Sequence, residues 1–477
     1  MSPSATQTRT GHGTSAPARS PAPALLVICA GYFLVILDAM VVNVALPSIG
    51  HELHGGVSGL QWTVDAYTLS FAGLLLTGGA LAERLGGRPV FTGGTALFAL
   101  ASAACGLAPS MGVLIAARFT QGIGAAALVP SSLVLLQAAF PARADRSRAL
   151  GVWGSVGGIG AACGPVIGGL LVSGWSWRGV FFINLPVALA ILVLAGRTVP
   201  ASERGTRAVD LPGQLLSITA LALLTAALVQ AGRAGWAAPG ILAGFALAAV
   251  AATAFVLTER RSRAPMMPLG LFRATEFRSG TLVGLLINLG FYGQLFVMSL
   301  YFQDIRGYSA LRTGLALLPE AALLVIGSTL SGRIMARTGP RTPMLAGLLA
   351  GAAGLGGIAA AAATAPYPVL AVAMGTAGFG MSMVMPAATA AVMEAAPPDR
   401  GGIASGVINA ARQAGGVLGV ALLGTLVPAR AGFAAGLELG VALSAAAFLL
   451  GAVLTATGVP RHHDSGPEPA GGAPRRP

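Results

Sequence analysis

Long apolar runs separated by short polar loops occupy the chain from residue 24 to residue 457. Fourteen of these runs approach the roughly 20 residues that a helix needs to cross the hydrocarbon core of a bilayer. They lie at 24–46, 62–82, 90–108, 112–139, 150–171, 179–196, 211–230, 238–258, 280–302, 313–332, 343–362, 367–391, 403–427 and 433–457. Because backbone amides find no water inside a bilayer, each run is predicted to be an α-helix. The pattern therefore predicts an all-α integral membrane protein with 14 transmembrane helices.

Two polar segments flank these runs. Residues 1–23 are rich in Ser, Thr, Pro and Ala, and residues 458–477 are similarly polar. Such sequences cannot bury enough apolar surface to fold, so both are predicted to be disordered tails. The first apolar run is long enough to span the membrane and carries polar residues of its own, so we expect no cleavable signal peptide.

The second half of the chain repeats residues of the first half at a nearly constant spacing. At an offset of 253 positions, the loop residues Gly79, Leu81, Arg84, Gly86 and Arg88 recur as Gly332, Ile334, Arg337, Gly339 and Arg341. Two further glycine-containing sets, in the fourth and fifth runs, recur at offsets of 256 and 255. Repeated halves with a site between them are typical of secondary transporters.

The repeat also indicates how the runs are grouped. The first six runs pair with the last six, which leaves the seventh and eighth as an insertion. We therefore predict a six-helix bundle at 24–196, a two-helix insertion with its linkers at 197–279, and a second six-helix bundle at 280–457.

Composition argues against a water-soluble protein. Only 9% of the residues are charged, whereas soluble domains average about 25%. All 29 basic residues are arginines; with the N-terminus inside, 22 of them lie in inner loops and tails and 5 in outer loops. Cytoplasmic loops carry such an excess, so both termini are predicted to be cytoplasmic. Because the arginines occupy short loops between apolar runs, the net charge of +13 does not indicate a nucleic-acid partner.

The loop from Gly79 to Arg88 combines glycines with charged side chains. Gly79 and Gly86 permit a tight turn and a close approach of the backbone. Glu83, Arg84 and Arg88 are then expected to bond to neighbouring helix ends, as a latch that opens when the halves rock. The alternative is the ordinary positive charge of an inner loop. Recurrence of the motif in the second half favours the conformational role.

The fifth run carries Gly160, Gly164 and Gly168 at four-residue intervals, which gives one smooth helix face for close packing. Pro165 removes a backbone hydrogen bond and is expected to bend this helix. Packing alone explains the glycines. The functional alternative is a tight seal against ion leak.

Asp38 and Arg118 are charged residues inside the first and fourth runs, at compatible depths. A charge at that depth costs a few kcal/mol or more, so we predict that the two form a pair. Protonation of Asp38 would release Arg118 and so couple a proton to conformation. The alternative is a purely structural buried ion pair. The second half has Met374 in place of this arginine.

Three other charged residues stand out. Glu320 follows Pro319 in the tenth run, where it is expected to bind substrate or a second proton. Arg412 lies midway along the thirteenth run and has no counterpart in the fifth. Asp65 lies near the predicted outer surface, so simple solvation and a functional role both remain open for it.

Several chemistries have no basis in the sequence. There is no Gly-x4-Gly-Lys-Ser/Thr loop for nucleotides, and the chain contains no Lys to form one. No soluble domain carries a Ser-His-Asp set or paired carboxylates. The three cysteines, Cys29, Cys105 and Cys163, lie in apolar runs and imply no disulfide framework. We expect no enzyme activity, no cofactor and no metal site.

With these residues in view, the chain resembles the fourteen-span drug:proton antiporter group of the major facilitator superfamily over residues 24–457. The similar motifs are Leu37-Asp38 with Asn43 and Pro47, the Gly79–Arg88 loop, Arg118 with Gln121-Gly122, Gly164-Pro165, and Asn409 with Arg412-Gln413. The resemblance implies the major facilitator fold and export driven by the proton gradient, with Asp38 and Arg118 as coupling residues. The candidates for a substrate cavity are Asn43, Gln121, Glu320, Asn409 and Arg412. The chain departs from the group at Glu83, where the loop motif usually has Asp, and in its scarcity of embedded acids.

We therefore predict proton-coupled efflux of small hydrophobic antibiotics or drugs by a monomer in the bacterial plasma membrane. Its expected partners are a small-molecule substrate, protons and the lipid bilayer. Embedded arginines beside few acids favour neutral or anionic compounds. Two alternatives remain open: uptake of a small metabolite, and a membrane sensor or scaffold that transports nothing.

Overall fold

The computed structural model describes residues 22–199, 210–262, 265–361, 365–397, 400–427 and 432–460. The tails predicted at 1–23 and 458–477 fall mostly outside these ranges. Their inner ends do not: Ala22 and Pro23 already belong to the first helix, and Gly458 still belongs to the last.

All the elements within the described ranges are helical. They are α1 (Ala22–Glu52), α2 (Val57–Leu85), α3 (Gly87–Gly106), α4 (Met111–Ala139), α5 (Arg143–Gly174), α6 (Gly179–Phe182), α7 (Asn184–Thr198), α8 (Leu211–Ala234), α9 (Pro239–Arg261), η1 (Leu269–Arg273), α10 (Thr275–Leu300), η2 (Tyr301–Ile305), α11 (Ala310–Ala316), α12 (Leu318–Thr338), α13 (Arg341–Ala361), α14 (Tyr367–Glu394), α15 (Gly401–Leu426) and α16 (Phe433–Gly458).

Fourteen helical segments in the described ranges are long and apolar enough to cross a membrane, which confirms the predicted number of spans. Three of these segments are compound. They join α6 to α7, α10 to η2, and α11 to α12. The helices also extend beyond the apolar runs: α1 continues through Pro47 to Glu52.

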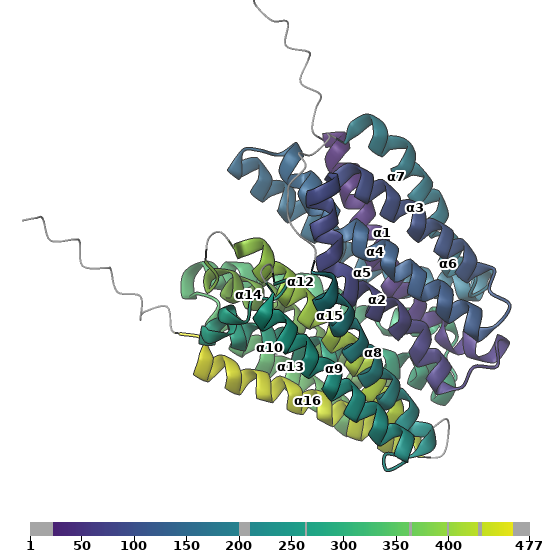
Figure 1. The fold of residues 1–477 in the computed structure, drawn as a ribbon. Helices are drawn as coiled ribbons and strands as arrows, with labels where there is room; N and C mark the ends of the chain where they lie inside the picture. Colours follow the sequence, from purple (N-terminus) through teal and green to yellow (C-terminus); the bar gives the residue numbers. More distant parts are fainter. Residues whose placement is uncertain are drawn as a thin grey trace, which may run out of the picture.

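The helices pack as two groups (Figure 1). In the first group, α1–α7, the main contacts join α2 to α4, α3 to α4 and α1 to α5. In the second group, α10–α16, they join α10 to α15, α13 to α14 and α12 to α14. Helices α8 and α9 pack on each other, and α8 also contacts α2 and α15, one helix from each group.

The repeat seen in the sequence has a direct structural counterpart. Helices α1 and α10 begin at Ala22 and Thr275, and α2 and α11 at Val57 and Ala310; each pair is 253 positions apart. The chain also turns in the same way at the repeated loop. Gly86 (φ 97°) follows α2 and its equivalent Gly339 (φ 73°) follows α12. Positive φ is accessible to glycine at little cost, which explains why this position recurs as glycine.

An even number of crossings places the start of α1 and the end of α16 on one side of the molecule, here named the terminal face. The two groups are joined by hydrogen bonds toward the other end, here named the closed face. Gln61 near the start of α2 donates to the Ala421 carbonyl of α15 (2.9 Å), and Gln303 of η2 donates to the Val44 carbonyl of α1 (2.9 Å). In Figure 1 the two groups lie together at the lower right and separate toward the upper left.

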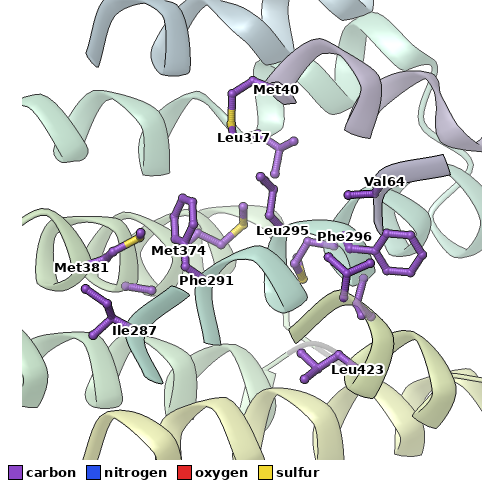
Figure 2. Packing of buried hydrophobic residues seen from close by; sticks show 14 of the residues in the cluster. Met40, Val64, Ile287, Phe291, Leu295, Phe296, Leu317, Met374, Met381 and Leu423 are labelled. Atoms are coloured by element: carbon purple, nitrogen blue, oxygen red, sulfur yellow. The ribbon is translucent and has the colours of Figure 1, made fainter. Parts of the chain in front are cut away.

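An apolar core continues across this junction (Figure 2). Met40 and Val64 of the first group belong to the same buried cluster as Leu295, Phe296 and residues of α15 from the second group. Closure at this face is therefore stabilised by apolar packing as well as by hydrogen bonds.

Within the second group, glycines bring α15 very close to α10. A Cβ atom at Gly419 would lie 2.1 Å from the Leu289 carbonyl oxygen, and one at Gly415 equally close to the Leu285 carbonyl oxygen. Such approach is typical of helix pairs in membranes, where packing of small residues replaces the hydrophobic effect as the driving force.

We expect Gly419→Ala to destabilise the protein by about 1–3 kcal/mol, because the new methyl group must push α15 away from α10. Gly356→Ala in α13 is the matched control, since a Cβ there meets nothing within 4 Å. The control should leave stability unchanged or raise it by about 0.5–1 kcal/mol. Thermal unfolding of the two variants in detergent measures both changes, and equal melting temperatures would contradict the close α10–α15 contact.

Candidate functional site

Asp38 of α1 and Arg118 of α4 form the ion pair that the sequence predicts. Arg118 Nη1 lies 2.6 Å from Asp38 Oδ2, and the side chains are 1% and 0% exposed. Both residues lie well inside their spans. The pair is thus removed from water on every side, in a medium where each charge would be costly alone.

Arg118 has further partners from α2 and from its own helix. Its Nε donates to the Thr63 carbonyl oxygen (3.1 Å), and Nη1 also donates to Gln121 Oε1 (2.8 Å). The Tyr67 ring lies flat against the guanidinium, with Cζ 4.2 Å from the ring centroid. The charge of Arg118 is therefore compensated within the first group by a carboxylate, two neutral acceptors and an aromatic face.

The second oxygen of Asp38 is bound just as firmly. Oδ1 accepts hydrogen bonds from Gln121 Nε2 (2.9 Å) and Asn184 Nδ2 (2.8 Å). Gln121 was predicted to line a substrate cavity. It is instead 0% exposed and bonds to both members of the ion pair. Its amide is a bridge inside the network, because its two ends match the donor and acceptor needs of the pair.

Ser102 of α3 completes this set, which we name the Asp38 network. Its Oγ accepts from Asn184 Nδ2 (2.9 Å) and Gln121 Nε2 (3.2 Å) and donates to the Phe181 carbonyl oxygen (2.9 Å). The sequence analysis missed Ser102, Asn184 and Tyr67. Asn184 offered one signal, an amide in an otherwise apolar stretch, but the partners come from α1, α2, α3, α4 and α7, so no spacing along the chain connects them.

The second group has no equivalent of this pair. At the repeat offsets, Asp38 corresponds to Phe291 and Arg118 to Met374. Both residues belong to the buried apolar core of the second group, where Figure 2 shows them near Met381. The repeated scaffold therefore carries charge in one half and ordinary apolar packing in the other.

Glu320 of α12 occupies the position equivalent to Tyr67. It is 2% exposed, and its only hydrogen bond among the described residues is a long one, from Gln294 Nε2 to Oε2 (3.4 Å). Its Oε1 has no partner there. The structure thus places Glu320 inside the second group, apart from the Asp38 network.

The remaining cavity candidates do not form one cluster. Asn43 is buried and donates to the Ala39 carbonyl of its own helix (2.9 Å). Asn409 likewise donates to the Ser405 carbonyl (2.9 Å) and accepts a weak bond from Arg412 Nη1 (3.4 Å). Among these three side chains, only Arg412 has a fully buried polar atom, its Nε, without a hydrogen-bond partner in the described residues.

Asp65 is not solvated. It is 0% exposed, and neither of its carboxylate oxygens has a hydrogen-bond partner in the described part of the chain. It lies one helical turn beyond Gln61, which bonds to α15, and a Cβ at Gly406 of α15 would meet Leu76 further along α2. Asp65 therefore belongs to the face of α2 that packs on α15.

In the loop motif at the end of α2, one glycine makes the turn and another allows close packing. Gly86 makes the turn after α2, and Gly78 rather than Gly79 allows close approach, since a Cβ there would lie 1.9 Å from the Ala126 carbonyl oxygen. Arg84 is exposed. The latch predicted for Glu83, Arg84 and Arg88 stays a prediction.

Gly164 and Pro165 lie where α5 contacts two helices. A Cβ at Gly164 would lie 2.3 Å from the Met40 Cβ of α1, and a Cβ at Gly314 of α11 would lie 2.1 Å from the Pro165 carbonyl oxygen. This stretch of α5 therefore packs on α1 within its own group and on α11 across the junction, near the closed face.

A sequence model described as Major Facilitator Superfamily matches residues 28–420. The chain is 39% identical to the methylenomycin A resistance protein of Streptomyces coelicolor over 90% of each sequence. It is 37% identical to the tetracenomycin C resistance and export protein of Streptomyces glaucescens, covering 86% of this chain and 77% of that protein. It is 40% identical to the multidrug resistance protein Stp of Mycobacterium tuberculosis, covering 84% and 74%.

Solved structures with the same arrangement of helices are more distant in sequence. An auto-inhibited peptide transporter of the POT family superposes with a TM-score of 0.68 at 15% identity, covering 91% of this chain and 96% of that one. The inward-open xylose transporter XylE from E. coli superposes with a TM-score of 0.64 at 16% identity, covering 93% and 97%. At such identities the likeness establishes the fold.

Ser102→Ala tests the Asp38 network. We expect a loss of about 1–3 kcal/mol in the free energy of unfolding, because the Asn184 amide loses an acceptor and the Phe181 carbonyl loses a donor. Ser444→Ala is the matched control, since Ser444 is also 0% exposed but donates only to Gly440 of its own helix (3.1 Å). Thermal unfolding in detergent compares the two variants. A loss no greater than that of the control would show that Ser102 does not support the network.

Proposed function

This chain belongs to the Major Facilitator Superfamily, and from that premise we propose that it exports small hydrophobic antibiotics or drugs across the plasma membrane in exchange for protons. The names of its curated relatives support the direction and the cargo, since they describe resistance to methylenomycin A or puromycin, export of tetracenomycin C, and drug efflux. The observation that carries proton exchange is the buried Asp38–Arg118 pair.

Protonation of Asp38 is the proposed coupling step. The ionised carboxylate accepts bonds from Arg118, Gln121 and Asn184. A proton on Asp38 cancels its charge and leaves that of Arg118 uncompensated inside the membrane. Removing one partner of a buried pair costs about 3–5 kcal/mol. That is comparable to the few kcal/mol that separate the states of a two-state protein, so one proton suffices to shift the balance.

Helix α1 is the proposed route from the proton to the rest of the molecule. It carries Asp38 midway along its length, packs on α5 through Met40, and accepts a bond from Gln303 of η2 at Val44. A change in the Asp38 network that moves α1 therefore acts on both contacts near the closed face. Tyr67 offers a second route, since its ring covers Arg118 and its helix, α2, packs on α15 of the second group.

In this proposal, residues 24–196 and 280–457 move as two bundles, with 197–279 as a linking insertion. Both termini lie in the cytoplasm, as the distribution of arginines predicts. The closed face is then the outer one, and the state described here is open toward the cytoplasm. The transporter acts as a monomer, because each chain contains both bundles and the interface between them.

We expect Asp38→Asn to abolish export driven by the proton gradient while the protein still reaches the membrane. The amide cannot bind and release a proton, so the compensation of the Arg118 charge no longer changes during the cycle. Everted membrane vesicles with an acidic lumen measure the accumulation of puromycin and methylenomycin A, and immunoblotting of the same vesicles measures the amount of protein.

Glu52→Gln is the matched control for this experiment. It is the same change of acid to amide on the same helix, but Glu52 is half-exposed at the closed face, where it pairs with Arg178 and accepts from Trp177 Nε1. Normal gradient-driven export by Asp38→Asn would refute proton coupling at this residue. Accumulation only in right-side-out vesicles would indicate uptake, and no movement of either compound by the wild type in liposomes would favour a sensor.

A further inference from the structure

The two arginines inside the membrane spans differ sharply in how their charge is compensated. Arg118 has a carboxylate, two neutral acceptors and an aromatic face. Arg412, midway along α15, has one long hydrogen bond to Asn409 Oδ1 (3.4 Å), and its buried Nε has no acceptor among the described residues.

No acid of the described chain compensates Arg412. Its stem packs on Gly284 of α10, and the ring of Tyr292 on α10 packs against Gly416, one helical turn beyond Arg412. A guanidinium at this depth is costly and is normally paired with an acid or with several carbonyl groups. Arg412 is therefore a cation without a counter-charge in the part of the chain that the structure describes.

Arg412 also lies where the two groups face each other. Tyr32 comes from the first group, whereas Tyr292 and Arg412 come from the second, and α1 and α10, the helices that carry the two tyrosines, contact each other. At the repeat offset of 255, Arg412 corresponds to Gly157 in α5. The Tyr32 ring packs directly against Gly157, since a Cβ there would lie 2.3 Å from the ring. The position that holds a cation in α15 thus holds a glycine in α5, against which an aromatic ring packs.

That aromatic surface is extended and held in place. The Tyr32 ring stacks on Trp153 of α5 with a centroid distance of 3.7 Å and an interplanar angle of 13°. Trp153 Nε1 in turn donates to Ser132 Oγ of α4 (3.1 Å). Two stacked rings beside a guanidinium match a ligand that has a flat apolar body and one anionic group.

We infer that Arg412 binds the anionic group of the exported compound, with Tyr32 and Tyr292 beside its apolar body. This inference rests on the proposed export function and specifies its substrate class, hydrophobic organic anions. Guanidinium binds the oxygens of carboxylate, sulfonate or enolate groups through charge-assisted hydrogen bonds, and such bonds are about twice as strong as neutral ones. The free Nε and the weakly engaged Nη1 are the donors available for this purpose.

Two fluorescent probes with the same ring system test this inference. 8-Anilinonaphthalene-1-sulfonate carries an ionised sulfonate at all working pH values, and N-phenyl-1-naphthylamine lacks it. Titration of the full-length protein in detergent, with an identical detergent blank subtracted, gives a dissociation constant for each probe. We expect the wild type to bind the sulfonate at least about tenfold more tightly, the range expected for a charge-assisted bond.

Arg412→Gln should weaken binding of the sulfonate by about tenfold or more and leave the neutral probe within about twofold. Arg412→Lys keeps the charge but loses the planar guanidinium group, so its affinity for the sulfonate should lie between those of the wild type and Arg412→Gln. It also serves as the second variant if Arg412→Gln does not fold. Arg312→Gln is the matched control, because it is the same change at an arginine that lies over a tyrosine ring (Cζ 3.9 Å from the Tyr308 centroid) but is exposed near the closed face. The control should bind both probes as the wild type does.

Equal affinity of the wild type for the two probes, or a parallel loss of both in the Arg412 variants, would overturn the inference. So would a loss of thermal stability in those variants with the preference for sulfonate unchanged, since Arg412 would then have a structural role. Because binding is measured without transport, the two proposals fail separately. A sulfonate preference that depends on Arg412, in a protein that exports nothing, would overturn the proposed export and support the anion site.

Discussion

The buried pair of Asp38 and Arg118 is the interaction on which the rest of the structure depends. A charge inside the membrane must be balanced locally, and here the balance is achieved by one carboxylate of α1 with amide and hydroxyl groups from α3, α4 and α7. These bonds hold α1, α3, α4 and α7 in one relative arrangement, so they position the helices as well as neutralise the charge. In the proposed cycle, a single proton on Asp38 cancels the carboxylate charge that these bonds stabilise.

In this proposal, the effect of protonation at Asp38 reaches the rest of the molecule because the helices make close contacts at glycine residues. Where backbones meet at Gly168 or Gly314, no flexible side chain lies between the helices to absorb a displacement. Helix α1 contacts both α5 and η2, and α5 continues the contact into α11. Packed interfaces of this kind shift between discrete arrangements rather than deform gradually. The glycine-rich composition thus allows a displacement of one helix to pass directly to the helix packed against it.

The two groups of helices share a repeated arrangement but differ in the charged side chains that they carry. The pair of Asp38 and Arg118 in the first group is Phe291 and Met374 in the second, where the same positions form part of an apolar core. The second group instead carries Arg412, with no equivalent charge in the first. The first group therefore holds a charge that is compensated internally, whereas the second holds one that lacks a counter-charge among the described residues. This asymmetry is the basis for proposing a proton site at Asp38 and a substrate site at Arg412.

The sequence by itself determined the fourteen spans, the repeat, the glycine turn at Gly86 and the pairing of Asp38 with Arg118. Hydropathy and the cost of an embedded charge are local quantities, so they can be inferred from the residues alone. Only the tertiary structure decided that Asn184 bonds to Asp38 and that Asp65 is buried against α15. Which side of a helix faces a neighbour depends on how all the helices rotate and pack, and an apolar stretch on a transmembrane helix does not specify that rotation.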